Sequence, residues 1–182
     1  RKGADRDDIN DFLANLLSNR KRNKYYSVHY DLDIIKAIGT LSSEDEDLVK
    51  LLLDSNKNDE YPLLASALDR QNKTAVELLI QAGASVNTVA SYDRRSVIGN
   101  YNSNMHSNVG SPMLHIAAET FNIELVKLLL YAEADVHSKD GNGHSLLENV
   151  VIATYCHVHK PDWVERAMNI VEFLVDYNPK LI

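Results

Sequence analysis

The sequence predicts an all-α protein, an α-solenoid of about four repeated helix-turn-helix units. Three observations support this fold class. Four short apolar runs share one form: two apolar residues, one charged residue and three apolar residues. Two of these runs are preceded at the same distance by a proline-led segment, and turn-forming residues follow them. Units of this kind bury their apolar faces by stacking on one another.

The four apolar runs are the predicted outer helices of the units. They lie at 48–53, 75–80, 125–130 and 170–175, and each fits a helix that is buried along one face. A shorter helix rich in small residues is predicted after Pro62 and after Pro112, because proline suits a first helical turn, where its missing N–H has no partner. Each proline precedes the valine of the next run, Val76 or Val126, by 14 residues.

Segments 82–87 and 132–137 end the second and third units. Gly83 suits the end of a helix because glycine adopts the left-handed conformation without steric cost. Glu133 stands at the matching position of the next unit. This replacement costs little if its φ is negative and more if its φ is positive.

These segments resemble ankyrin repeats. The opening at 112–118, the exit at 132–136 and the turn at 139–143 match the family's pattern, and Leu114 and Leu147 are 33 residues apart, which is the family's period. The resemblance covers about residues 31–179. It implies repeats at about 31–58, 59–87, 110–142 and 143–182, after an N-terminal helix and basic connector at 1–30.

The sequence departs from regular repeats in two places. Pro62 and Pro112 are 50 residues apart, 17 more than one period, which predicts an insertion at 88–109, where the family has a β-hairpin. The fourth repeat has 12 further residues between its helices, around 154–166, which predict a second expanded loop. The inner helix of the first repeat, around 31–40, matches the pattern poorly.

The N-terminal segment 7–19 is predicted to form one amphipathic helix. Its apolar stripe would cover the exposed core of the first repeat as a cap; the alternative is that it ends an upstream domain, since the chain opens on Arg1 as a piece of a longer protein would. The basic group that follows suits a helix C-terminus, and the alternative is an import or lipid-surface signal. The stripe is Ile9, Phe12, Leu13, Leu16 and Leu17, and the basic group is Arg20, Lys21, Arg22 and Lys24.

Composition excludes several classes of function. The net charge of -7 disfavours nucleic acid as a partner, and no apolar stretch is long enough for membrane insertion. Cys156 is the only cysteine, which predicts a reducing, cytoplasmic environment. No nucleotide loop, HExxH helix or GxSxG elbow is present, so we expect no enzyme and no cofactor in this segment. We also expect the domain to be monomeric.

Two polar groups admit an ion-site interpretation, which we consider weaker than a structural one. Cys156, His157 and His159, with His144, have zinc-ligand chemistry, but neighbours on an extended segment point apart and no CxxC frame is present, so we expect no metal. The acidic run 44–47 is better explained by a helix start, with Ser43 as N-cap and a carboxylate three residues later in a capping box.

The resemblance also implies where function lies. His115 matches the histidine of the ankyrin opening, whose use in the family is structural hydrogen bonding between loops. The family's recognition surface is the concave groove formed by turn tips and exposed ends of inner helices. The insertion adds tyrosine and arginine, which often anchor interfaces, although a tolerated surface loop is an equal alternative. The predicted partner-binding residues are Asn58, Asp59, Tyr61, Asp69, Arg70, Tyr92, Arg94, Arg95, Tyr101, Met105, Ser111, Glu119, Thr120, Asn142 and His144, with Asn108, Ile152 and Ala153 at related positions.

The sequence therefore predicts a protein–protein interaction module that binds another protein through the groove and the insertion. Two alternatives are a substrate-recruiting or targeting domain of a larger enzyme, with its catalytic part outside this segment, and a structural spacer. The frequent asparagine, lysine and isoleucine resemble usage in AT-rich genomes. This composition favours an effector or scaffold delivered into a host cytosol.

Overall fold

The structure, a computed structural model, describes residues 11, 15, 27–55, 62–90, 110–156 and 161–178, although not the side chains of 27–32, 156 and 161. These residues are mostly helical, which confirms the predicted fold class. The elements are α2 (Ser27–Ile38), η2 (Ser43–Asp45), α3 (Glu46–Ser55), α4 (Leu63–Asp69), α5 (Lys73–Gln81), β1 (Val89–Ala90), β2 (Ser111–Pro112), α7 (Met113–Glu119), α8 (Ile123–Tyr131), α9 (Leu146–Cys156) and α10 (Pro161–Tyr177).

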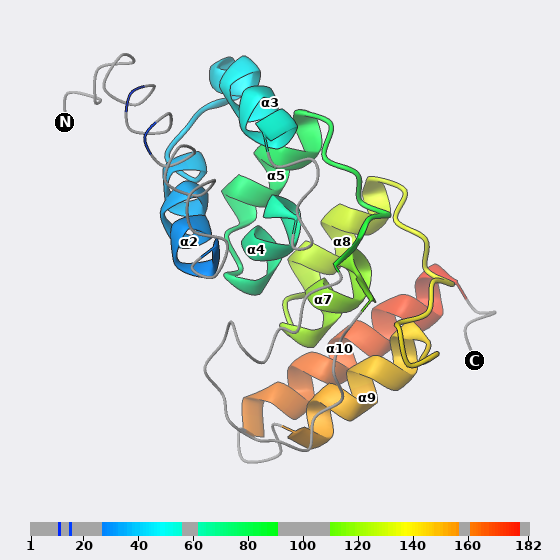
Figure 1. The fold of residues 1–182 in the computed structure, drawn as a ribbon. Helices are drawn as coiled ribbons and strands as arrows, with labels where there is room; N and C mark the ends of the chain where they lie inside the picture. Colours follow the sequence, from blue (N-terminus) through cyan, green and yellow to red (C-terminus); the bar gives the residue numbers. More distant parts are fainter. Residues whose placement is uncertain are drawn as a thin grey trace.

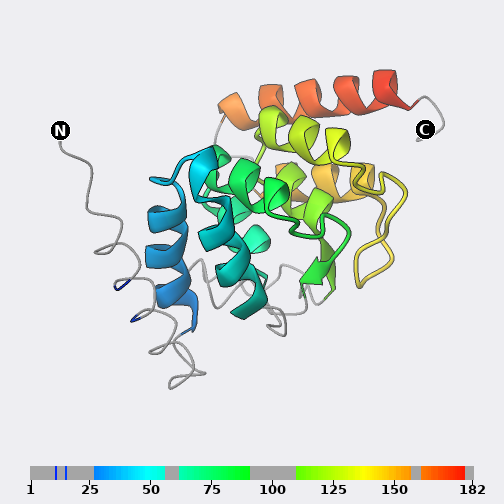
Figure 2. The same cartoon turned by 90° about the horizontal axis from the view of Figure 1, so that it is seen from above.

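Four helical pairs stack one after another, from α2 with α3 to α9 with α10 (Figures 1 and 2). The inner helices α2, α4, α7 and α9 pack in that order, and the outer helices α3, α5, α8 and α10 form a parallel row. One continuous core of aliphatic side chains runs through the stack. Among the described helices, the main contacts therefore join adjacent repeats, as in other solenoids.

The inner helices α4 and α7 are short because their sequences start and stop them sharply. Pro62 and Pro112 are extended N-caps, with φ of -60° and -61°, and the six residues after each are buried. Both helices end in a turn where Gln71 (φ 51°) and Phe121 (φ 54°) adopt the left-handed conformation. The outer helix then begins at an asparagine whose side chain caps it.

Asparagine side chains also tie successive repeats together. Asn72, the N-cap of α5, donates to the Ile35 carbonyl of the first repeat at 3.3 Å. Asn87 accepts from the Asp135 N–H at 2.8 Å and donates to the Glu133 carbonyl at 3.2 Å, so it bridges the exits of the second and third repeats. These bonds set the register of the stack where the apolar core alone leaves freedom.

The exits of the second and third repeats share one backbone shape. Gly83 has φ 95° and Glu133 has φ 65°, so both are left-handed. Glu133 therefore carries the positive φ that the sequence left open, at a cost of about 1 kcal/mol for a side chain with a Cβ. The bond from Asn87 to the Glu133 carbonyl holds this strained residue in place.

Two short strands at the ends of the insertion pair with each other as in a β-hairpin. β1 and β2 pair antiparallel, with Val89 opposite Pro112 and Ala90 opposite Ser111. The Gly110 N–H donates to the Ala90 carbonyl at 3.0 Å, and Ala90 and Ser111 are buried. The base of the insertion is therefore built into the stack, while residues 91–109 lie outside the described residues.

Two expectations about local structure are wrong. The additional residues of the fourth repeat are mainly helical, because α9 continues to Cys156 and α10 begins at Pro161. In α10 the core-facing residues Ala167, Ile170 and Leu174 keep helical spacing and are buried, and Trp163 is partly buried one turn before them. An apolar stripe of that length stabilises a longer helix rather than a loop.

The second correction concerns the start of α3. The N-cap is Ser42 rather than Ser43, and its partner is Asp45 rather than Glu46. The Ser42 N–H and hydroxyl each lie 3.0 Å from the Asp45 carboxylate. A short 3-10 turn precedes α3, which moves the cap by one residue. The predicted N-terminal cap helix lies outside the described residues, apart from Asp11 and Asn15, which are helical.

Candidate functional site

The ends of the inner helices carry polar side chains at equivalent positions of neighbouring repeats. Asp69 and Arg70 follow the buried part of α4, and Glu119 and Thr120 follow that of α7. Arg70 is exposed and the other three are partly exposed. Because α4 packs on α7, the two pairs lie along the same edge of the stack, which we call the inner-helix edge. It carries both signs of charge, which suits a protein partner better than a phosphate or a fatty ligand.

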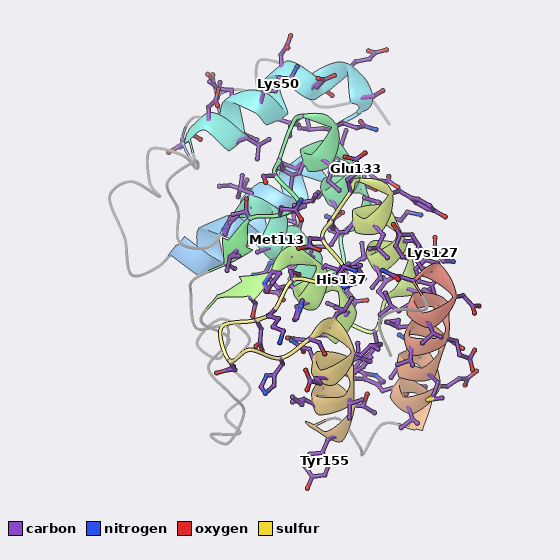
Figure 3. The ribbon with its side chains drawn as sticks, turned by 90° about the vertical axis from the view of Figure 1, so that its right-hand side faces the viewer. Lys50, Met113, Lys127, Glu133, His137 and Tyr155 are labelled. Atoms are coloured by element: carbon purple, nitrogen blue, oxygen red, sulfur yellow. The ribbon has the colours of Figure 1, made fainter. Side chains whose placement is uncertain are left out.

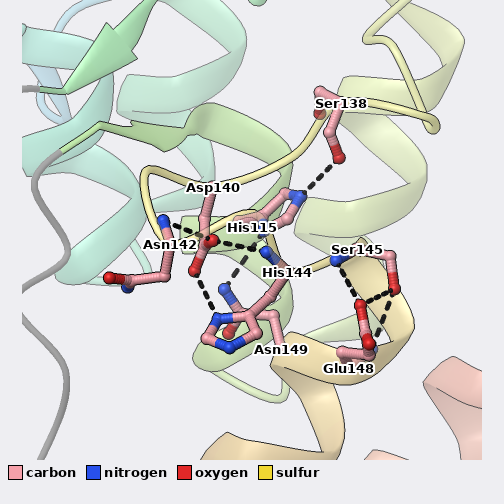
Figure 4. A network of polar contacts seen from close by, with 8 residues as sticks. All are labelled: His115, Ser138, Asp140, Asn142, His144, Ser145, Glu148 and Asn149. Atoms are coloured by element: carbon pink, nitrogen blue, oxygen red, sulfur yellow. Dashed lines mark hydrogen bonds and ion pairs between the residues drawn. The ribbon is translucent and has the colours of Figure 1, made fainter.

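The turn between the third and fourth repeats is built around one buried carboxylate. Asp140 accepts from the N–H groups of Asn142 at 2.9 Å and His144 at 2.8 Å, and its other oxygen lies 3.1 Å from Nδ1 of His144 (Figure 4). Gly143 completes the turn with φ 84°. The turn therefore presents the Asn142 side chain at a defined position.

Two opposing effects act on the pKa of Asp140. Burial raises it, because the charged form loses solvation. The hydrogen bonds from the His144 backbone, the His144 ring and the Asn142 backbone lower it and outweigh burial, so the pKa lies below its usual value. Asp140 is therefore ionised at neutral pH and holds the turn as a charged acceptor.

His115 connects this turn to the helices beneath it. Its Nε2 lies 3.0 Å from the Ser138 carbonyl and its Nδ1 lies 3.1 Å from Nδ2 of Asn149 on α9. A carbonyl only accepts, so Nε2 carries the proton and Nδ1 accepts from Asn149. The side chain is fully buried, and burial lowers its pKa, so the ring is neutral. Its role is structural, as the resemblance implies.

Ser145 and Glu148 start α9 immediately after the turn. The Ser145 N–H and hydroxyl donate to Glu148 Oε2 at 2.7 Å each, which completes a capping box. The backbone and side-chain bonds from Ser145 lower the pKa of Glu148. Figure 4 shows these as three neighbouring sets of polar contacts, around Asp140, around His115 and between Ser145 and Glu148.

The base of the insertion lies against this same turn. A Cβ on Gly110 would stand 3.3 Å from the Cα of Gly141, so the two backbones are in close contact. The backbone at position 110 has φ 88°, a conformation that favours glycine. The hairpin base and the Asn142 turn are therefore neighbours. In the sequence, however, the insertion lies between the second and third repeats, and the Asn142 turn lies between the third and fourth.

The structure describes only part of the predicted partner-binding set. Asp69, Arg70, Glu119, Thr120, Asn142 and His144 keep exposed surface. Ser111 does not: it is fully buried in β2, so its side chain cannot contact a partner and the prediction is wrong for this residue. Ala153 is likewise buried, because α9 continues past it. Outside the described residues lie Asn58, Asp59, Tyr61, Tyr92, Arg94, Arg95, Tyr101, Met105 and Asn108.

Sequence reasoning missed two features. Asn149 is a buried partner of His115, and only the alignment of α9 on α7 brings them together. Large apolar side chains are also exposed on α9 and α10. The repeat pattern predicts that these positions are helical, but it does not predict whether another helix covers them. These are Val151, Tyr155, Val164 and Met168.

Metal and membrane sites find no support in the described part of the chain. Among its residues, no group of three or more His, Cys, Asp or Glu side chains could hold a metal ion. The side chain of Cys156, with His157 and His159, lies outside it. None of the helices described is both long and apolar enough to cross a membrane.

Comparison with known families identifies the repeats. A family model for ankyrin repeats, in three copies, matches residues 37–140, which is more than half of the chain. The chain therefore belongs to the ankyrin-repeat family, whose repeats generally mediate protein–protein interactions. No curated protein sequence matches the chain significantly.

Proposed function

We propose that this domain binds a partner protein through the inner-helix edge, the Asn142 turn and the insertion at 88–109. The observation that carries the proposal is the position of the hairpin base, which contacts the turn of a different repeat through Gly110 and Gly141. The described ends of the insertion therefore lie beside a turn tip of the kind that ankyrin repeats generally use.

The surface is preorganised. Asp140 and His115 hold the turn by buried hydrogen bonds, and residues 63–68 of α4 and 113–118 of α7 are buried. A partner therefore meets a rigid edge, and little conformational entropy is lost in ordering it. Arg70 and Glu119 give the edge opposite charges in adjacent repeats, which favours a partner with complementary charges.

The proposal is tested by affinity capture from cell lysate with quantitative mass spectrometry, on three matched proteins. The first is the domain as it is. The second replaces residues 91–109 by one asparagine, which with Gly110 forms an Asn-Gly turn between the paired Ala90 and Ser111. The third is Arg70→Glu with Glu119→Lys, which changes the edge but leaves the core intact.

We expect a protein captured by the domain to be depleted about tenfold with the second or the third variant. Tyr131→Ala is the control, because Tyr131 is exposed on the outer helix α8, away from the inner-helix edge. All variants must first show the helical circular dichroism of the parent. If every captured protein is retained equally by all four proteins, neither the edge nor the insertion is the binding surface.

A further inference from the structure

The helical pair α9 and α10 carries large apolar side chains that the described part of the structure leaves exposed. On α9 the exposed fractions are 63% for Val151 and 82% for Tyr155, and on α10 they are 44% for Val164 and 52% for Met168. Val171 and Val175, which continue the α10 stripe at helical spacing, are only partly buried. We call these six residues the end face. Tyr155 points away from the molecule at the end of α9 (Figure 3).

Two residues of the end face match core positions of the third repeat. Val151 matches Ala118 by the 33-residue period, and Ala118 is fully buried. Val171 matches Val126, which is also fully buried. In the third repeat the following pair of helices covers these positions, since α7 packs on α9 and α8 on α10. Val151 and Val171 thus stand where, in the third repeat, the next helical pair provides cover.

The other side of α10 is already occupied. Trp163 packs edge-on against Phe121 with ring centroids 5.1 Å apart, and Lys127 lies 5.5 Å from the centre of the Phe173 ring. These contacts attach α10 to the third repeat. Val164 and Met168 remain exposed on another flank of α10, and Val171 beside them is partly buried and packs against the core.

Charge identifies the kind of helix that fits. Glu165, Glu172 and Asp176 are exposed and recur at intervals of seven and four residues, so they form a line beside the apolar stripe. Asp162, the fourth carboxylate of α10, already pairs with Arg166 at 3.5 Å. Pairing with α10 of a second copy would set one acidic line against another, whereas a helix with basic flanks would complement it.

We propose that the end face of α9 and α10 binds an amphipathic helix with basic flanks from another protein. The helix lies along α10, whose 17 residues give about 25 Å of surface, nearly twice that of the nine-residue α8. Its apolar stripe covers Val164, Met168 and Val151, and its basic residues pair with Glu165, Glu172 and Asp176.

The experiment measures binding of a dye-labelled, 18-residue peptide by fluorescence anisotropy at low and high salt. The peptide carries leucine on one helical face and lysine on its flanks. One control peptide has the same composition in scrambled order, and another has glutamate in place of lysine. We expect the amphipathic basic peptide to bind about tenfold more tightly than either control, and to weaken with salt.

Variants locate the binding. The double substitution Val164→Glu with Met168→Glu changes exposed side chains. We expect it to weaken binding of the basic peptide about tenfold. The double substitution Glu165→Lys with Glu172→Lys should weaken binding of the lysine peptide and strengthen binding of the glutamate peptide. Leu51→Glu is the control, because Leu51 is 60% exposed at the opposite end of the stack. Circular dichroism and thermal unfolding confirm that each variant folds.

Three results would overturn the proposal. Equal binding of the scrambled peptide would show that only net charge acts. If Leu51→Glu lowers the peptide affinity as much as the α10 variants do, or if the α10 variants leave the affinity unchanged, the peptide binds elsewhere. A dimer in sedimentation equilibrium that Val164→Glu with Met168→Glu dissociates would make a second copy the occupant. The partner capture proposed above depends on other residues, at the inner-helix edge, the Asn142 turn and the insertion, so either proposal can fail alone.

Discussion

The third and fourth repeats have the same helical plan but opposite surroundings. Val126 in α8 is fully buried, whereas Val171, its equivalent in α10, is partly exposed. His115 in α7 is buried and bonds to the next inner helix, whereas Glu148 at the matching position of α9 is exposed and caps its own helix. A position in a repeat is therefore core or surface according to whether another helical pair packs on it.

Truncating the two equivalent valines tests this comparison with the largest expected effect. Val126→Ala should lower the free energy of unfolding by about 2–3 kcal/mol, because it leaves a cavity between two covered repeats. Val171→Ala should cost about 1 kcal/mol or less, because solvent already reaches its side chain. Urea unfolding measures both; equal losses would show that α10 is as well covered as α8.

His115 tests the polar link that the third repeat has and the fourth lacks. His115→Gln should cost about 1–3 kcal/mol at pH 7, because the Ser138 carbonyl and Asn149 lose their buried partner. Burial lowers the pKa of the folded-state histidine, so the unfolded chain takes up the proton first as the pH falls below about 6.5. This stability is present above that pH and is lost as the pH decreases.

The measurement is urea unfolding at pH 7, 6 and 5 for both proteins. The parent should lose stability more steeply than His115→Gln, by up to about 1.4 kcal/mol per pH unit. Because the other histidines are common to both proteins, the difference reports His115. Parallel pH profiles would mean that the ring is not protected from protonation.

The repeat exits offer a smaller test, between the second and third repeats. Glu133→Gly should stabilise the protein by about 1 kcal/mol, because it removes a side chain from a residue with φ 65°. Gly83→Glu should destabilise it by a similar amount: no atom lies within 4 Å of its Cβ position, so only the backbone at φ 95° resists. Thermal unfolding checks both, and opposite signs are expected.

The smallest expected effect concerns the outer surface. Lys73 lies 3.9 Å from Glu77 in its own helix and 3.7 Å from Glu124 in the next repeat. All three side chains are about half exposed, so Lys73→Ala should change the free energy of unfolding by less than about 0.5 kcal/mol. A larger loss, removed by 0.5 M salt, would show that surface charge as well as the core joins the repeats.

Sequence alone determined the family, the number of repeats and most helix positions. The reason is that period and local signals coincide: Pro62 and Pro112 start the inner helices, and the apolar runs define the outer ones. It also located the insertion, whose ends form β1 and β2. Part of the candidate surface followed from the same register, notably Arg70, Glu119 and Asn142.

Only the tertiary structure decided which of these residues are accessible. Ser111 lies at a turn by sequence, but its pairing opposite Ala90 buries it. The extra residues of the fourth repeat became helix because their apolar stripe had a neighbour, α8 and α9, to pack on. The end face, likewise, is visible only once the stack shows what covers each helix. Local signals determine where helices begin and end, but exposure depends on contacts between residues far apart in the chain.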